Sequence, residues 1–210
     1  MIIGPGVTIY LPPKTGTTAL RAAAQAIGWR SPRHHMNRWE HPAPAGHRIV
    51  CARRNPWSWY ASLYDWISSQ GTGCWRGFGV SGFRSWMRML FQDHPAAIGF
   101  PEAQRVVGRM RATGIGLATY RVVQLCGHGD PQKMEPRIPE DVLWLRTEHL
   151  AEDWEALLCL VGVRGVPPLP RLKTSTRERD WRDYYDADLR DRVAIKDQML
   201  IERFGYTFDG

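Results

Sequence analysis

Apolar positions along the chain fall into two patterns. The first is a short run of consecutive apolar residues, many of them β-branched, which is typical of a buried strand. Such runs occupy residues 7–11, 48–52 and 142–146. The second pattern is the recurrence of apolar residues at helical spacing. It predicts helices over residues 17–27, 57–69, 83–91, 117–126, 150–161 and 187–204.

Strands that alternate with helices indicate an α/β fold with a parallel sheet and helices on both faces. The length of 210 residues predicts a single domain over residues 1–210. The Gly- and Pro-punctuated segments 29–46 and 69–82 predict loops, whereas 93–116 shows no clear pattern. Ligands of such folds bind at the carboxyl ends of the strands, so the turns after the strands are where we expect a site.

The turn after the first predicted strand has the composition of an anion site. It carries Lys14 and leads directly into a helix. The N–H groups and the positive dipole end of a helix attract a phosphate or sulfate, and a lysine adds a full charge. We therefore interpret Lys14, Thr15, Gly16, Thr17 and Thr18 as a cradle for such a group. The alternative interpretation is an ordinary N-capped helix.

The turn after the second strand offers a second anion site. Arg54 ends the strand, and Ser62 lies two turns into the following helix. An arginine fork can bind a phosphate bidentately, and a hydroxyl can add a neutral donor. The alternative is that Arg54 caps a carbonyl group and Ser62 is an ordinary residue of the helix surface.

Composition and charge restrict the class of protein. The chain is 43% hydrophobic and 23% charged, as in ordinary globular proteins, and no run approaches the length of a membrane span. A net charge of +7 implies an acidic partner, but the basic residues are scattered, which argues against a nucleic-acid-binding arm. The four cysteines are spread singly, which predicts buried, reduced thiols in a cytoplasmic protein and no zinc site. No secretory signal pattern is present.

Together, the two turns resemble those of the sulfotransferase family that uses 3′-phosphoadenosine 5′-phosphosulfate (PAPS). Residues 13–18 are similar to its 5′-phosphosulfate loop, and residues 54–56 with Ser62 are similar to its 3′-phosphate site. Weaker similarities are residues 145–150 and, near the end, 184–186 with 204–206. The resemblance implies a P-loop-like three-layer fold, with PAPS bound across the strand ends.

The resemblance also implies roles for single residues. Lys14 is expected to stabilise charge on the leaving phosphate, and residues 15–18 are expected to hold the 5′-phosphate. Arg54 and Ser62 are expected to bind the 3′-phosphate. The late basic loop that closes on the nucleotide in this family is matched by Lys173 and Arg177. Positioning and electrostatics suffice for such an in-line transfer, so we expect no metal.

The acceptor needs a general base, and relatives use His or Glu near the cleft. We favour His35 or His34, because histidine titrates near neutral pH. Other residues at suitable places in the chain are Glu40, His41, Glu148 and His149. We expect the predicted loop 29–46, here called the His-rich loop, and the span 69–86 to line the acceptor cleft.

The predicted function is sulfuryl transfer from PAPS to a hydroxyl or amine of a small-molecule or carbohydrate acceptor, with adenosine 3′,5′-bisphosphate (PAP) as product. One alternative is a P-loop nucleotide-binding or kinase-like protein. The nucleotide motif G-x-x-x-x-G-K-[ST] is absent, however, since Lys14 precedes Gly16. The other alternative is a non-enzymatic module that binds a polyanion through its basic surface.

Overall fold

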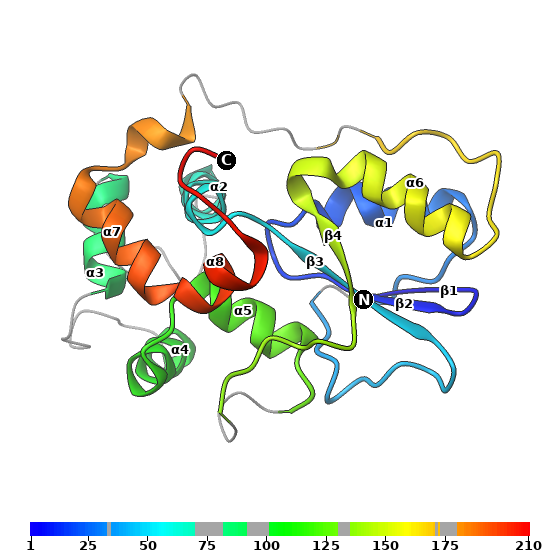
Figure 1. Cartoon of the computed structure of the whole chain (residues 1–210), viewed down its shortest axis with the longest axis horizontal. Coiled ribbons are helices and arrows are strands. Elements are labelled where there is room, and N and C mark those ends of the chain that lie inside the picture. The colour runs from blue at the N-terminus through cyan, green and yellow to red at the C-terminus, as the bar shows by residue number, and fades with distance from the viewer. Residues whose placement is uncertain (33–34, 70–81, 92–100, 130–134, 171, 173–179) are drawn as a thin grey trace. The chain divides into compact units, whose positions relative to one another are not determined.

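The computed structural model describes residues 1–32, 35–69, 82–91, 101–129, 135–170, 172 and 180–210. The chain divides into two compact units, the first made of Met1–Arg54 and Arg121–Thr174, the second of Asn55–Tyr120 and Ser175–Gly210. The described residues form a four-stranded, mostly parallel sheet and eight α-helices (Figure 1). The α/β class is therefore confirmed, whereas the single domain stays a prediction.

The sheet belongs to the first unit and has the order β1-β2-β3-β4. Its strands are β1 (Ile2–Gly4), β2 (Val7–Tyr10), β3 (Arg48–Arg53) and β4 (Leu143–Arg146). The last three are parallel, as predicted, and β1 pairs with β2 in the antiparallel sense. The sequence pattern does not predict β1, because a three-residue strand beside a turn is too short to show a period.

One face of the sheet is covered by α1 (Thr17–Ala26) and α6 (Leu150–Leu160). Fully buried Trp154 of α6 contributes the largest side chain to this cluster, and its ring meets Trp29 edge-on at 5.5 Å between centroids. Both helices follow a strand directly, so the packing of their apolar faces fixes the turns that connect them to β2 and β4.

The other face of the sheet contacts the end of α5 (Leu117–Cys126). Tyr10 and Cys51 from the strands pack there against Leu125 and Cys126, and all four are buried. In the described part of the first unit, the sheet is thus covered by two helices on one face and by a helix end on the other. The finer three-layer, P-loop-like arrangement stays a prediction.

The second unit is helical. Its helices are the start of α5 and α2 (Pro56–Ser69), α3 (Phe83–Phe91), α4 (Pro101–Thr113), α7 (Ala187–Lys196) and α8 (Gln198–Phe204), with the 3₁₀ turn Trp181–Tyr184. Aromatic rings fill its core; those of Phe83 and Tyr185, for example, meet at 5.0 Å between centroids. In the part of the chain that the structure describes, no helix is both long enough and apolar enough to cross a membrane.

The predicted helix over 187–204 is wrong in one respect, because it breaks at Asp197 into α7 and α8. The Asp197 carboxylate is buried and turned inward, where it accepts hydrogen bonds from the backbone and hydroxyl of Thr119 (2.8 and 2.7 Å) and from the Tyr60 hydroxyl (2.8 Å). Burial raises the pKa of Asp197 to about 6, against the effect of these hydrogen bonds. The break therefore serves to cap the start of α5.

Further expectations need correction or completion. Helix α4 lies in the segment that showed no pattern. Trp66 has the helical spacing of Trp59 and Leu63 on α2, but 44% of its surface is exposed whereas those two are buried. Cys51 and Cys126 are buried free thiols as predicted, whereas Cys159 is exposed, because the buried face of α6 is the one that carries Trp154 and Leu157. The predicted loop at 70–81, with Cys74, lies outside the described residues.

Candidate functional site

The turn between β2 and α1 has an unusual backbone. Lys14 has a φ of 65° and Gly16 a φ of 74°, both in the left-handed region. Left-handed residues within a tight turn direct successive N–H groups to one side, forming an anion-binding nest. Helix α1 begins at Thr17 with no side-chain cap on its first N–H groups. Such a turn can present backbone N–H groups to an anion.

Two of its threonines hold the shape of the turn. The hydroxyls of Thr15 and Thr17 donate to the carbonyl oxygen of Pro12 at 2.6 and 3.2 Å, and both side chains are buried. Both belong to the predicted cradle for the anion, but in this structure their hydroxyls donate within the turn. What they offer a ligand is their backbone N–H groups. Thr18, in the first turn of α1, is half-buried.

Arg54, at the end of the neighbouring strand, bonds directly to this turn. Its Nη1 donates to the main-chain oxygen of Lys14 at 3.1 Å. Both residues are half-buried. The carboxyl ends of β2 and β3 therefore bring two cationic residues together. Arg54 makes the carbonyl-capping contact that was the alternative to a phosphate site, and its binding of a phosphate stays a prediction.

The turn after β4 joins the same place through two contacts. Thr147 donates its hydroxyl hydrogen to the Arg53 carbonyl oxygen at 2.7 Å. Leu150 covers Gly16 so closely that a Cβ on the glycine would lie 2.2 Å from Leu150 Cδ2. Sequence reasoning singled out this segment as a similarity in residues 145–150 and for the candidate bases Glu148 and His149. The contacts of Thr147 and Leu150 have no local signal, because their partners are distant in the chain.

An ion pair fixes the start of α6 in the same region. Arg146 and Asp153 approach to 2.6 Å, and the Arg146 backbone N–H also donates to the carboxylate. Burial alone would raise the pKa of Asp153, but the hydrogen bonds from the side chain and backbone of Arg146 outweigh it and hold that pKa below its usual value. The pair therefore anchors the turn that carries Thr147.

Among the candidate bases, His35 contacts this turn. Its ring Nδ1 lies 3.0 Å from the carbonyl oxygen of Leu11, the residue that follows β2. A carbonyl can only accept, so Nδ1 carries the hydrogen and the neutral ring has its lone pair on Nε2. His35 is exposed and has a φ of 50°. His34 lies outside the described residues.

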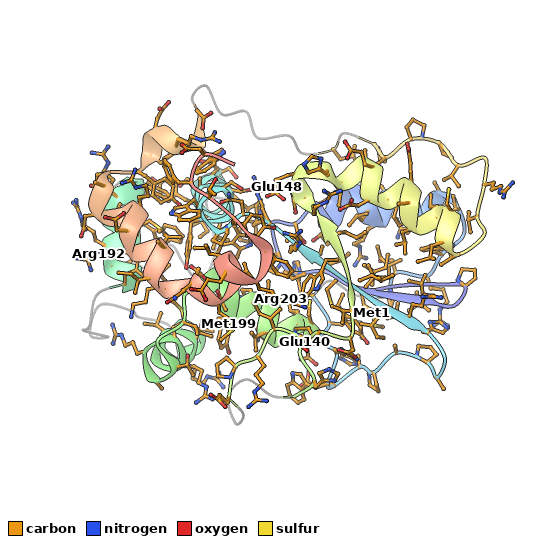
Figure 2. The ribbon with its side chains drawn as sticks, viewed as in Figure 1. Met1, Glu140, Glu148, Arg192, Met199 and Arg203 are labelled. Atoms are coloured by element: carbon orange, nitrogen blue, oxygen red, sulfur yellow. The ribbon has the colours of Figure 1, made fainter. Side chains whose placement is uncertain are left out.

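Other base candidates have contacts of their own. Glu40 accepts a hydrogen bond from Asn37 at 2.7 Å. His149 Nδ1 lies 3.2 Å from Glu152, with both side chains exposed. Glu148 lies at the turn that follows β4 (Figure 2). Because β2, β3 and β4 are parallel, this turn is at the same end of the sheet as Lys14 and Arg54.

Much of the described part of the His-rich loop lies at the opposite end of the strands from the Lys14 turn. There a cavity of about 800 Å³ opens at the amino ends of β3 and β4. Figure 2 shows Glu140, which lines it, before β4, and Glu148 beyond the strand's other end. The cavity is also lined by Arg38, Trp39, Pro42, His47, His128 and Asp141. Arg38 binds Asp141 at 2.6 Å, which ties the loop to the start of β4 rather than to the Lys14 turn.

The structure does not place three predicted nucleotide-binding residues relative to the Lys14 turn. Ser62 is half-buried on α2, which belongs to the second unit. Lys173 and Arg177 lie outside the described residues. The pairing of Arg54 with Ser62 and the closing basic loop therefore stay predictions.

In the first unit, the turn between β2 and α1 thus contains Lys14 and is contacted by Arg54 and His35. Together they supply positive charge, backbone N–H groups and an imidazole. This set can bind an anionic group and can accept a proton next to it. Comparison with descriptions of protein families, with curated proteins and with solved structures finds no match for this chain.

Proposed function

We propose that the protein is a sulfotransferase that moves a sulfuryl group from PAPS to a hydroxyl or amine of a small-molecule or carbohydrate acceptor. The observation that carries the proposal is the hydrogen bond of Arg54 to the main chain of Lys14. It joins two cationic residues at adjacent strand ends, and PAPS carries anionic groups on two carbons of one ribose. The resemblance of residues 13–18 and 54–62, and the P-loop-like fold it implies, support the same assignment.

In the proposed reaction the acceptor atom attacks sulfur in line with the bond that breaks. A new bond from the acceptor to sulfur forms, and the bond between sulfur and the bridging oxygen of the 5′-phosphate breaks with its electron pair staying on that oxygen. Lys14 and the N–H groups of residues 16–18 stabilise the charge that develops on the leaving phosphate. Holding donor and acceptor in line accounts for much of the remaining rate enhancement.

The proton of the acceptor goes to His35 in this proposal. The Leu11 carbonyl holds the hydrogen on Nδ1, so Nε2 is the nitrogen that accepts the proton. A positioned base of this kind contributes about 10²–10⁴ in rate.

Ligand binding tests the proposal against its alternatives. PAP should raise the melting temperature, and at a hundredfold excess over Kd the free energy of unfolding should rise by about 2.7 kcal/mol. A kinase-like protein would instead be stabilised better by ATP with magnesium. A polyanion-binding module would bind heparin with steep salt dependence and ignore PAP. No shift with millimolar PAP overturns the proposal.

Turnover is tested with labelled PAPS and a panel of hydroxyl and amine acceptors, read by mass spectrometry for an added sulfate. Lys14→Ala should abolish turnover and leave the fold intact. Arg48→Ala is the matched control, because Arg48 is an exposed cation at the opposite end of β3. Full activity of Lys14→Ala would remove Lys14 from the mechanism.

A further inference from the structure

The bond between Arg54 and Lys14 fixes a peptide plane of the anion-binding turn. Arg54 Nη1 donates to the carbonyl oxygen of Lys14 at 3.1 Å. That carbonyl and the N–H of Thr15 belong to one planar trans peptide group and point in opposite directions. A side chain that holds the oxygen therefore also sets the direction of the Thr15 N–H group, in the middle of the nest.

The turn needs such a hold at this point. Lys14 is left-handed, a conformation that residues with a side chain adopt rarely. The hydroxyls of Thr15 and Thr17 both bind the Pro12 carbonyl, so they hold the peptide group between Pro12 and Pro13 and not the one after Lys14. Arg54 supplies the hold on the following peptide group from another strand.

We propose that Arg54 is a positioning residue for the 5′-phosphosulfate turn, in addition to the role expected for it at the 3′-phosphate. This inference rests on the proposed function. A guanidinium has five N–H donors in a planar fork, so a bond to Lys14 is compatible with a simultaneous grip on a phosphate. Arg54 thus couples the two ends of the donor nucleotide: it contacts one and shapes the binding turn of the other.

Two nucleotides separate this role from that of a simple phosphate ligand. Adenosine 5′-phosphosulfate (APS) has the whole 5′ group of PAPS and no 3′-phosphate, whereas PAP has the 3′-phosphate. If Arg54 only contacts the 3′-phosphate, Arg54→Ala weakens PAP binding and leaves APS binding unchanged. If it positions the turn, the affinity for APS also falls, by about tenfold, as expected when a hydrogen bond from a charged group is lost.

A second measurement needs no ligand. The amide signals of residues 15–18 in the ¹⁵N–¹H spectrum of the free protein should shift in Arg54→Ala, and their hydrogen exchange should become faster. Arg48→Ala, which removes a cation from the other end of β3, should change neither. If Arg54→Ala does not fold, Arg54→Lys takes its place, because lysine keeps the charge but lacks the planar fork of donors. Its nucleotide affinities and amide signals are compared with those of the wild-type protein in the same way.

The outcomes are distinguishable. Weaker binding of both nucleotides together with shifted amide signals supports the positioning role. Weaker PAP binding with unchanged APS binding and unchanged amides overturns it and leaves the proposed function standing. If the wild-type protein binds neither nucleotide, the proposed function fails, and the amide signals alone decide whether Arg54 shapes the turn.

Discussion

Replacing Gly16 with alanine measures how firmly the strand-end turns are packed together. At a φ of 74°, a residue with a side chain costs about 1–2 kcal/mol. The new Cβ would also lie 2.2 Å from Leu150 Cδ2, so Leu150 must move, and such overpacking typically costs about 1–3 kcal/mol. We therefore expect Gly16→Ala to lower the free energy of unfolding by about 2–5 kcal/mol.

Gly28→Ala is the matched control. Gly28 has a φ of 78°, and a Cβ there would meet nothing within 4 Å, so the control includes only the backbone cost. Urea unfolding followed by circular dichroism gives both values, and their difference isolates the contact with Leu150. Adding Leu150→Ala to Gly16→Ala should recover part of that difference, which a double-mutant cycle detects as a coupling.

Equal losses in Gly16→Ala and Gly28→Ala would refute the reasoning. That result would mean that the Leu150 side chain can move away from Gly16 at no cost in free energy, and that the turn after β4 does not pack on the anion-binding turn. If the packing is as described, Gly16→Ala should weaken PAP binding as well, because the N–H groups of the turn can no longer converge.

Three other predictions concern single contacts. The pKa of Asp197 is about 6 in the folded chain and 3.8 as its ordinary value, so the free energy of unfolding should decrease by about 3 kcal/mol in total as pH rises from about 3 to about 7. Asp197→Asn should remove this decrease in urea titrations at several pH values, and an unchanged slope would contradict it. Thr147→Val removes the hydroxyl that binds the Arg53 carbonyl and should cost about 0.5–1.5 kcal/mol in the same assay; no loss would mean the bond is not stabilising. Lys14→Gly should be more stable than Lys14→Ala by about 1 kcal/mol, because only glycine accepts a φ of 65° without strain, and equal stability would show that the turn is relaxed.

The strands that carry the candidate site can be predicted from the sequence, because burial leaves a continuous apolar run. β2 is buried at every position and β3 at its centre, and neither shows the alternation of a half-exposed strand. The turn after β2 can also be recognised from the sequence, because its lysine, glycine and threonines follow one another directly before a helix.

The contacts between the turns could not be predicted. Arg54 and Lys14 are 40 residues apart, and Thr147 and Arg53 are 94 apart. Nothing local tells which carbonyl oxygen an arginine or a threonine will bind. His35 was proposed for its chemistry, and its contact with Leu11 likewise depends on the fold.

Missed element boundaries have a related cause. Aspartate is only mildly unfavourable inside a helix, so the break at Asp197 depends on Thr119 and Tyr60, which come from other helices.

The buried Pro12 carbonyl limits which sequences this turn can have. Proline has no N–H, so residues 12 and 13 add no hydrogen-bond donor to the sheet, and the Pro12 oxygen depends on hydroxyls from two later positions. In a library of variants selected for folding, serine should be recovered at positions 15 and 17, while valine, of nearly the same shape as threonine, should be depleted. Thr18 is under no such demand in this structure. Thr18 is therefore the position in the turn at which a substitution that changes the preference for the sulfuryl donor should cost the least folded protein.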